Sequence, residues 1–179
     1  MVRSRKSEEE ANIIYIIEWE ISLNDKPGYV SPIFIEYAGK KMIINVSMNH
    51  AFGVDAENGT ILWTQAHEKP DSFAWELIKC VTPLYDNGMI YITGGYDCGD
   101  MMLKLGADGN SVTKVWANSI LDVHHGGVVK VGGYIYGANW INNGNGNWCC
   151  IDWNTGKKNG KTLELQGFHY FSRRHVVYL

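Results

Sequence analysis

Hydrophobic and polar positions alternate with a period of two residues in three separate parts of the chain. The clearest cases are MIINV from Met42, MIYIT from Met89 and YIYGA from Tyr134. Each follows a short apolar segment and a turn that contains glycine, and this alternation is typical of strands that bury one face. The three turns are Ala38-Gly39, Asn87-Gly88 and Gly132-Gly133. The pattern therefore predicts three β-hairpins.

The residues after each hairpin extend it to four strands. A third strand runs into another glycine turn, and a fourth strand follows that carries Trp63 in the first copy and Trp116 in the second. These later turns are Glu57-Asn58-Gly59, Ala107-Asp108-Gly109 and Asn154-Thr155-Gly156. A four-stranded unit that recurs about every 40 to 50 residues is typical of β-propeller blades.

The expected fold is all-β: an incomplete β-propeller of four-stranded antiparallel blades, about three blades plus the end of another that Trp19 marks. A β-sandwich is the alternative, but it gives no reason for the glycine turns and tryptophans to recur in the same order. The expected divisions are a remnant strand or N-terminal extension at 1–18, blades within 19–158 at approximately 30–66, 79–118 and 126–158, and a non-conforming tail at 159–179.

Composition agrees with short twisted strands and excludes some partners. The 179 residues include seven Trp, ten Tyr and twenty Gly, and the formal net charge is −3. Lys and Arg are scattered, with no stripe that would follow a phosphate backbone, so nucleic acid is not an expected partner. Near the N-terminus the longest apolar run is Ile13 to Ile17, so no membrane span is expected.

The segment GVDAENGTILW, from Gly53 to Trp63, combines an aspartate, an Asn-Gly pair and a tryptophan. It resembles the tryptophan-docking motif of the PQQ-like, or quinoprotein alcohol dehydrogenase-like, β-propellers. The segment from Cys150 to Lys157 repeats its first half, and that from Leu105 to Gly109 is a degenerate copy. The resemblance implies a structural role, with tryptophans docking between blades, for Asp55, Asn58, Gly59, Trp63, Trp116, Asp152 and Gly156.

The motif also has an account of its own, as a turn. Asn58-Gly59 is a favoured hairpin pair because both residue types tolerate positive φ, and Asp55 can accept hydrogen bonds from the turn's N–H groups. A calcium loop of the EF-hand type is disfavoured, because Gly59 falls at the fifth position and Ala66 at the twelfth. No metal site is therefore expected here.

His124 and His125, followed by two glycines, come just before the first strand of the third copy. In a propeller that place lies near the central channel, so the pair could line a ligand or metal site; a hydrogen-bonded loop is the alternative. Asp97 and Asp100 are expected to be solvated loop carboxylates. No Ser-His-Asp arrangement, P-loop or dinucleotide motif is present, so no catalytic residue is predicted.

Cysteines leave the redox compartment open, because the four show no C-x-x-C pair. Some relatives in the resembled family carry a disulfide between adjacent cysteines against the cofactor. In this chain the adjacent pair is Cys149 and Cys150, in a predicted strand. Neighbours in a strand point to opposite faces, which favours two separate strand residues.

The expected function is a non-catalytic binding or protein-interaction scaffold, without a cofactor. Its partner would be a protein or small-molecule ligand at the propeller face, and open blade edges would allow self-association. Two alternatives follow from the resemblance: a fragment of a quinoprotein alcohol dehydrogenase that uses PQQ and calcium, and an outer-membrane assembly scaffold. Resemblance also implies a periplasmic or cell-surface place for full-length relatives.

The tail at 159–179 lacks the tryptophan-bearing fourth strand that the third copy requires. Codons exist for these residues which, read one nucleotide later, encode a tryptophan, a strand and a turn like that of the second copy. One hypothesis is therefore that the chain is a fragment of a longer propeller protein whose reading frame shifts before this tail.

Overall fold

The computed structural model describes residues 18–67, 79–142 and 145–160, together with the backbone of three short strands beyond them. Every regular element in these parts of the chain is a β-strand, so the all-β prediction is confirmed. Within the same parts, no helix has the length and apolar character that crossing a membrane requires. The predicted extension at 1–18 lies outside the described residues, except for its last residue.

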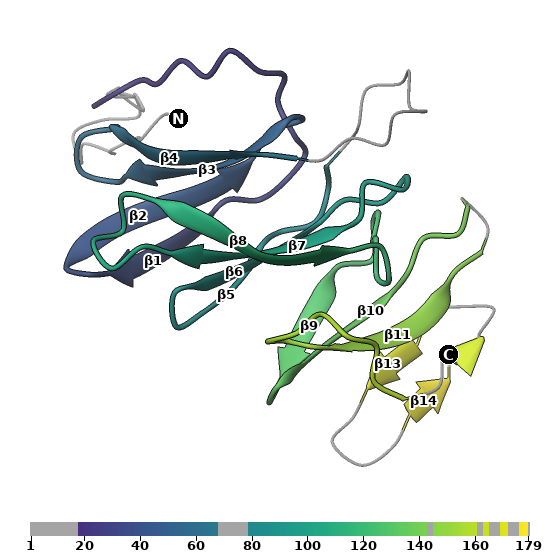
Figure 1. Ribbon diagram of the computed structural model, residues 1–179. Helices are drawn as coiled ribbons and strands as arrows, with labels where there is room; N and C mark the ends of the chain where they lie inside the picture. The colour runs from purple at the N-terminus through teal and green to yellow at the C-terminus, as the bar shows by residue number, and fades with distance from the viewer. Residues whose placement is uncertain are drawn as a thin grey trace, which may run out of the picture.

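Three four-stranded antiparallel sheets follow one another along the chain (Figure 1). The first blade contains β1 (Ile33–Tyr37), β2 (Lys40–Val46), β3 (His50–Asp55) and β4 (Ile61–Ala66). The second contains β5 (Leu84–Asp86), β6 (Met89–Thr93), β7 (Asp100–Leu105) and β8 (Val112–Asn118). The third contains β9 (Val128–Val131), β10 (Tyr134–Ala138), β11 (Asn147–Asp152) and β12 (Leu163–Glu164). The strands of each blade are ordered as in the chain, which makes every blade a meander.

The end of the chain adds a short hairpin of β13 (His169–Phe171) and β14 (Val176–Tyr178). The fourth place in the third blade is taken by the two residues of β12, which pair with Asn147 and Trp148. The hypothesis of a shifted reading frame concerns residues 159–179, whose side chains lie outside the described part of the chain from residue 161 onward.

The turns between the first two strands of each blade require unusual backbone angles. Ala38 and Gly39 have φ of 52° and 74°, and Asn87 and Gly88 have 46° and 77°. Two successive positive φ values are what a tight type I′ hairpin needs, and glycine or asparagine adopts them at little cost. In the corresponding turn of the third blade, Gly132 has a positive φ and Gly133 does not.

The blades pack face to face because each strand alternates apolar side chains between two sides. On β6, Ile90 and Ile92 belong to the core shared with the first blade, while Tyr91 between them belongs to the core shared with the third. All three are at most 3% exposed. The middle blade is thus buried on both faces, which explains why its second strand is apolar at nearly every position.

Asp55 caps the turn between β3 and β4 of the first blade. The Asp55 carboxylate accepts hydrogen bonds from the backbone N–H groups of Glu57 at 2.8 Å and Asn58 at 3.3 Å. Asp152 holds the equivalent turn of the third blade in the same way, through the backbone of Asn154 and Thr155. Each aspartate thus uses one carboxylate oxygen to hold its turn.

One detail of this turn differs from the prediction. Gly59 has a φ of 79°, but Asn58 does not share the positive φ expected of an Asn-Gly hairpin pair. Its side-chain oxygen instead accepts the N–H of Thr60 at 2.9 Å. The turn is therefore capped twice by side chains, at Asp55 and Asn58, and needs only one residue in the left-handed region.

Two tryptophans lie over turn glycines in the blade that follows them. The Trp19 indole N–H donates to the carbonyl of Ala56 at 3.2 Å, and a Cβ added to Gly59 would lie 2.7 Å from the Trp19 ring. In the same way, the Trp116 indole donates to the Trp153 carbonyl at 3.2 Å and lies over Gly156, where an added Cβ would be 2.6 Å from the ring. Only glycine allows an indole to approach the backbone this closely.

Trp63 behaves differently. Its ring lies over Gly53 of its own blade, where an added Cβ would overlap the indole. The side chain is 5% exposed, and its indole nitrogen is buried without a hydrogen-bond partner. No tryptophan ring is among the closest neighbours of Gly109, the turn glycine of the second blade.

Candidate functional site

Two buried carboxylates fix the segment that leads from the second blade to the third. Asp100, at the start of β7, is 3% exposed and accepts the N–H groups of Leu121 and Asp122, both at 2.9 Å, and the hydroxyl of Tyr91 at 2.8 Å. The prediction that Asp100 is a solvated loop carboxylate is therefore wrong. Its position opposite Thr93 at the end of the β6–β7 ladder directs the side chain inward, where backbone donors meet it.

Asp122 continues this network toward the solvent. Its carboxylate accepts the N–H groups of Asp97 and Gly99, both at 2.7 Å, and so closes the loop between β6 and β7. Asp97 itself is exposed, as expected for a loop carboxylate. Burial raises the pKa of both Asp100 and Asp122 against the lowering effect of these hydrogen bonds. The two acids thus act as structural acceptors that hold neighbouring loops together.

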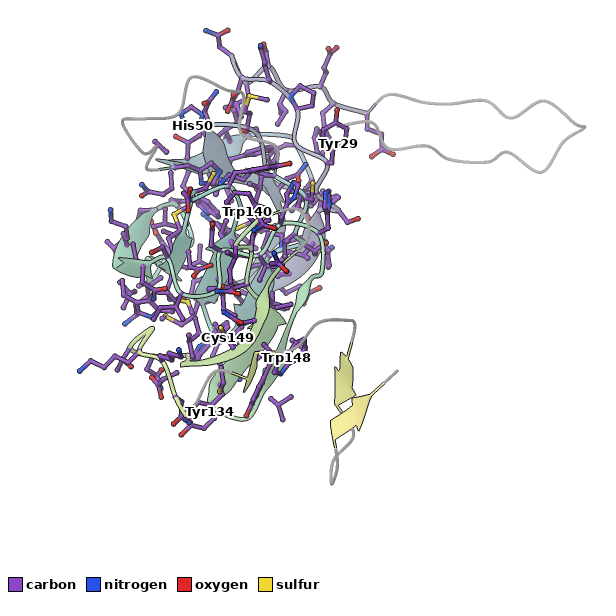
Figure 2. The ribbon with its side chains drawn as sticks, turned by 90° about the vertical axis from the view of Figure 1, so that its right-hand side faces the viewer. Tyr29, His50, Tyr134, Trp140, Trp148 and Cys149 are labelled. Atoms are coloured by element: carbon purple, nitrogen blue, oxygen red, sulfur yellow. The ribbon has the colours of Figure 1, made fainter. Side chains whose placement is uncertain are left out.

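The loop closed by Asp122 is strained. Tyr96 and Asp97 have φ of 55° and 58°, values that residues with a side chain rarely adopt. Tyr96 also packs edge-on against His124, with ring centroids 4.1 Å apart, and lies 4.9 Å from the Trp140 ring. Figure 2 shows Trp140 in the middle of the molecule, between the ends marked by Tyr29 and Tyr134. Strain held in place by aromatic packing and carboxylates is a feature of sites where a loop must keep one shape.

The two histidines predicted as channel candidates lie together beside this loop. His124 is 6% exposed, whereas His125 is exposed, and their ring centroids are 3.6 Å apart. A bend in the chain at these residues brings both rings to one side, which a strand would not allow. Burial, with a smaller contribution from the neighbouring His125, lowers the pKa of His124. The lowered pKa favours the neutral imidazole over its charged form.

A third residue, which was not predicted from the sequence, joins the pair. Cys80, just before the second blade, brings its sulfur within 4.8 Å of a ring nitrogen of each histidine. The signal was present in the repeat: Cys80 and His125 each stand four residues before equivalent strand positions, Leu84 and Val129. Aligning the repeats on their first strands places them side by side, because first strands of adjacent blades are neighbours in space.

A cavity of about 320 Å³ with a mixed polar and apolar lining opens beside the loop between β6 and β7. Lys79, only 2% exposed, lines it together with Cys98 and Asp100. Burial raises the pKa of the Cys98 thiol, and the nearby Lys79 ammonium only partly offsets this. A raised pKa favours the protonated thiol, which is a weaker nucleophile than the thiolate.

The remaining cysteines carry no bond between them. Cys149 is 3% exposed in the core shared with the second blade, and Cys150 next to it is half-buried on the other face of β11. None of the four cysteines, all of which lie in the described part of the chain, forms a disulfide. The alternation of the strand separates the adjacent pair, as the sequence indicated.

Comparison with known proteins gives similarity at the level of structure. No family model and no curated protein matches the chain. Among solved structures, the chain is similar to BamB from Moraxella catarrhalis, with a TM-score of 0.61 and 12% sequence identity over 83% of this chain. The fold is that of the PQQ-like β-propellers.

A second propeller structure shows the same likeness. Quinohemoprotein alcohol dehydrogenase ADHIIG from Pseudomonas putida HK5 matches with a TM-score of 0.51 and 16% identity over 78% of this chain. The chain spans 44% of the length of BamB and 21% of the length of the dehydrogenase. It therefore has the architecture of a partial PQQ-like propeller.

Proposed function

We propose that this chain belongs to a non-catalytic propeller that works as a protein-interaction scaffold, and that it binds through the outer face of its third blade. The outer face is defined here by Val129, Val131 and Tyr134, which are 47%, 59% and 36% exposed. Figure 2 shows Tyr134 at the opposite end of the molecule from Tyr29 and His50. Large apolar side chains gathered on one sheet face favour burial against a partner.

The observation that carries the proposal is that the positions equivalent to Val129 pack against the next blade in the other two blades. Ile35 and Met42 pair in the first blade and are 6% and 0% exposed against the second blade. Leu84 and Tyr91 pair in the same register in the second blade and pack against the third. The residue in this register on β9 is Val129, which is 47% exposed. The outer face therefore has the pattern of a blade–blade contact.

The partner that fits this face is another blade-like sheet. Within the chain, such a face is covered by the opposite side of the next blade, so a second copy can supply the side of its first blade that carries Phe34. Phe34 is 59% exposed and points away from the core shared with the second blade. Contact between two different faces is head-to-tail, and it can continue from copy to copy.

Sedimentation of the full chain over a range of concentrations tests the proposal. We expect wild type to self-associate, and Val131→Lys and Phe34→Lys each to abolish self-association. Val115→Lys is the matched control, because Val115 on β8 is 46% exposed but lies outside both faces. A mixture of the two interface variants should form heterodimers, since each keeps one intact face. A monomeric wild type, or equal loss of association in the control, contradicts the proposal.

A quinoprotein dehydrogenase is the second candidate, favoured by the structural likeness to ADHIIG. Calcium in such a site requires oxygen ligands, whereas the group of potential ligands found in the described residues is Cys80, His124 and His125. These donors do not fit calcium. Titration of the chain with PQQ and calcium, followed by dye-linked alcohol oxidation, tests this candidate, and saturable binding with turnover would establish it.

A further inference from the structure

We propose that Cys80, His124 and His125 form a binding site for a divalent metal ion of the zinc class, independent of the scaffold role of the outer face. The three residues come from two segments, the chain before β5 and the bend before β9. They lie where the inner strands of adjacent blades begin, since β5 and β9 contact each other.

The donor atoms are close to the arrangement that a tetrahedral ion requires. One sulfur and two ring nitrogens all lie within 4.8 Å of one another. Around zinc, with bonds of about 2.0 to 2.3 Å, such donors are about 3.3 to 3.6 Å apart. To reach zinc-binding distances, the sulfur and the two ring nitrogens therefore have to approach one another by about 1 Å. His125 can make them, because its side chain is exposed and Gly126 and Gly127 follow it.

One of the three residues also carries an unsatisfied polar atom. Nε2 of His124 is buried and has no hydrogen-bond partner. Buried polar atoms almost always have a partner, so an isolated one calls for an explanation such as a bound ion. An ion bound at this nitrogen would supply the missing partner.

The surrounding structure holds the cluster in place before any ion binds. Thr93 accepts the N–H of Val123 at 2.8 Å, and Asp100 accepts the N–H of Asp122, so the residues just before His124 are fixed to the second blade. Tyr96 packs against the His124 ring. Positioning of this kind, by groups outside the ligand set, is typical of metal sites.

The chemistry of the donors selects the ion. Imidazole and thiolate suit zinc and its neighbours cobalt, nickel and copper, whereas calcium and magnesium prefer oxygen. Three protein donors leave a fourth position for water or for a donor from a ligand. A bound ion would link the starts of the second and third blades and present that open position near the inner strands.

Cobalt titration of the full chain, freed of metal by a chelator and kept reduced with a phosphine, tests the site. We expect one ion per chain, with the intense visible bands of tetrahedral cobalt and a near-ultraviolet band from sulfur-to-metal charge transfer. Zinc should displace the cobalt. Zinc should also raise the melting temperature, because an ion that binds only the folded chain stabilises it.

Three variants decide the assignment. Cys80→Ser should remove the charge-transfer band, and both Cys80→Ser and His125→Ala should weaken binding at least about tenfold, the loss caused even by removing a supporting group. Cys150→Ser is the matched control, because Cys150 is also half-buried but lies in the third blade away from the cluster. It should bind like wild type. Absence of the sulfur band in wild type, or wild-type affinity in both ligand variants, overturns the proposal.

His125→Ala keeps the test interpretable if Cys80→Ser disturbs the fold, because its side chain is exposed. Circular dichroism should show that it folds like wild type. The zinc-induced rise in melting temperature should then be lost in His125→Ala and kept in Val131→Lys. A rise that persists in Val131→Lys shows that zinc binding does not depend on the outer face of the third blade.

Discussion

Trp116 and Trp63 stand on the fourth strands of successive blades, yet they contact the fold in different ways. Trp116 reaches into the third blade, lies over Gly156 and donates its indole N–H to the Trp153 carbonyl. Trp63 turns back onto Gly53 of its own blade, and its indole nitrogen has no partner. The same residue at the same place in the repeat therefore has two roles.

The acceptor turn explains the difference. Trp116 and Trp19 both meet turns that begin with an aspartate whose carboxylate caps the turn, Asp152 and Asp55. The turn that follows Trp63, Leu105 to Gly109, begins without an aspartate. Its cap comes from Asp108, whose carboxylate accepts the N–H of Asn110. Docking thus depends on the turn that receives the indole, and the following experiments compare the two situations.

Trp63→Ala should have the largest effect. Removing a ring that is 5% exposed leaves a cavity, and the expected loss is about 3 to 5 kcal/mol in the free energy of unfolding. Urea denaturation measures it. Trp116→Ala should cost less, because Trp116 is only half-buried. A negligible loss for Trp63→Ala would mean that the ring is not packed over Gly53.

Gly156→Ala should come next, with a loss of about 2 to 4 kcal/mol. Alanine at a φ of 67° adds strain of about 1 kcal/mol, and its Cβ would overlap the Trp116 ring and displace it. Gly109→Ala is the matched control, since its φ is 73° but the nearest side-chain atom, on Met42, would lie 3.4 Å from the new Cβ. Its loss in urea denaturation should be the strain alone. Equal losses would contradict docking at Gly156.

Replacing each indole with phenylalanine compares the two N–H groups. Trp116→Phe loses the hydrogen bond to the Trp153 carbonyl, which contributes about 1 kcal/mol. Trp63→Phe removes a buried N–H that has no partner, so it should cost less than expected from its lost ring area. Thermal unfolding of the pair measures the difference. A larger loss of stability for Trp63→Phe than for Trp116→Phe would contradict the assignment of the hydrogen bond to Trp116.

Asp152→Asn should have the smallest effect, and one that depends on pH. Hydrogen bonds from the side chain and backbone of Thr155 lower the pKa of Asp152 below its ordinary value of 3.8. A lowered pKa in the folded state means that the carboxylate stabilises the fold above pH 3.8, and that this contribution is lost as the pH falls through the folded-state value. The variant should therefore be less stable than wild type at pH 7 and approach it in acid. If the difference in urea midpoint between wild type and Asp152→Asn is the same at pH 7 and in acid, ionisation of Asp152 does not contribute to the stability of this turn.

The repeat made much of the fold predictable. Alternation in MIINV, MIYIT and YIYGA, with turns at Gly39, Gly88 and Gly132, was enough to indicate the three sheets. Local patterns did not predict the burial of side chains that contact a distant segment of the chain. Asp100 was expected in solvent but is buried by donors from residues 121 and 122, which no local pattern reveals.

The candidate site shows the same division. Adjacent histidines marked His124 and His125 from the sequence, while Cys80 lies 44 residues earlier in the chain than His124 and meets them only in the folded structure. Repeat alignment could have found it, because equivalent places before the first strands of neighbouring blades are close in space. Burial of His124 and the free Nε2 required the packing of Tyr96 and could not be predicted.

By itself, the sequence determined the strands, their antiparallel order and the capped turns, because alternation, glycine placement and side-chain caps act over a few residues. Only the tertiary structure decided which tryptophan docks, which carboxylates are buried, and that a cysteine joins two histidines. Those outcomes depend on contacts between blades, where the cost of leaving a polar atom unpaired or an apolar ring exposed is set by neighbours distant in the chain.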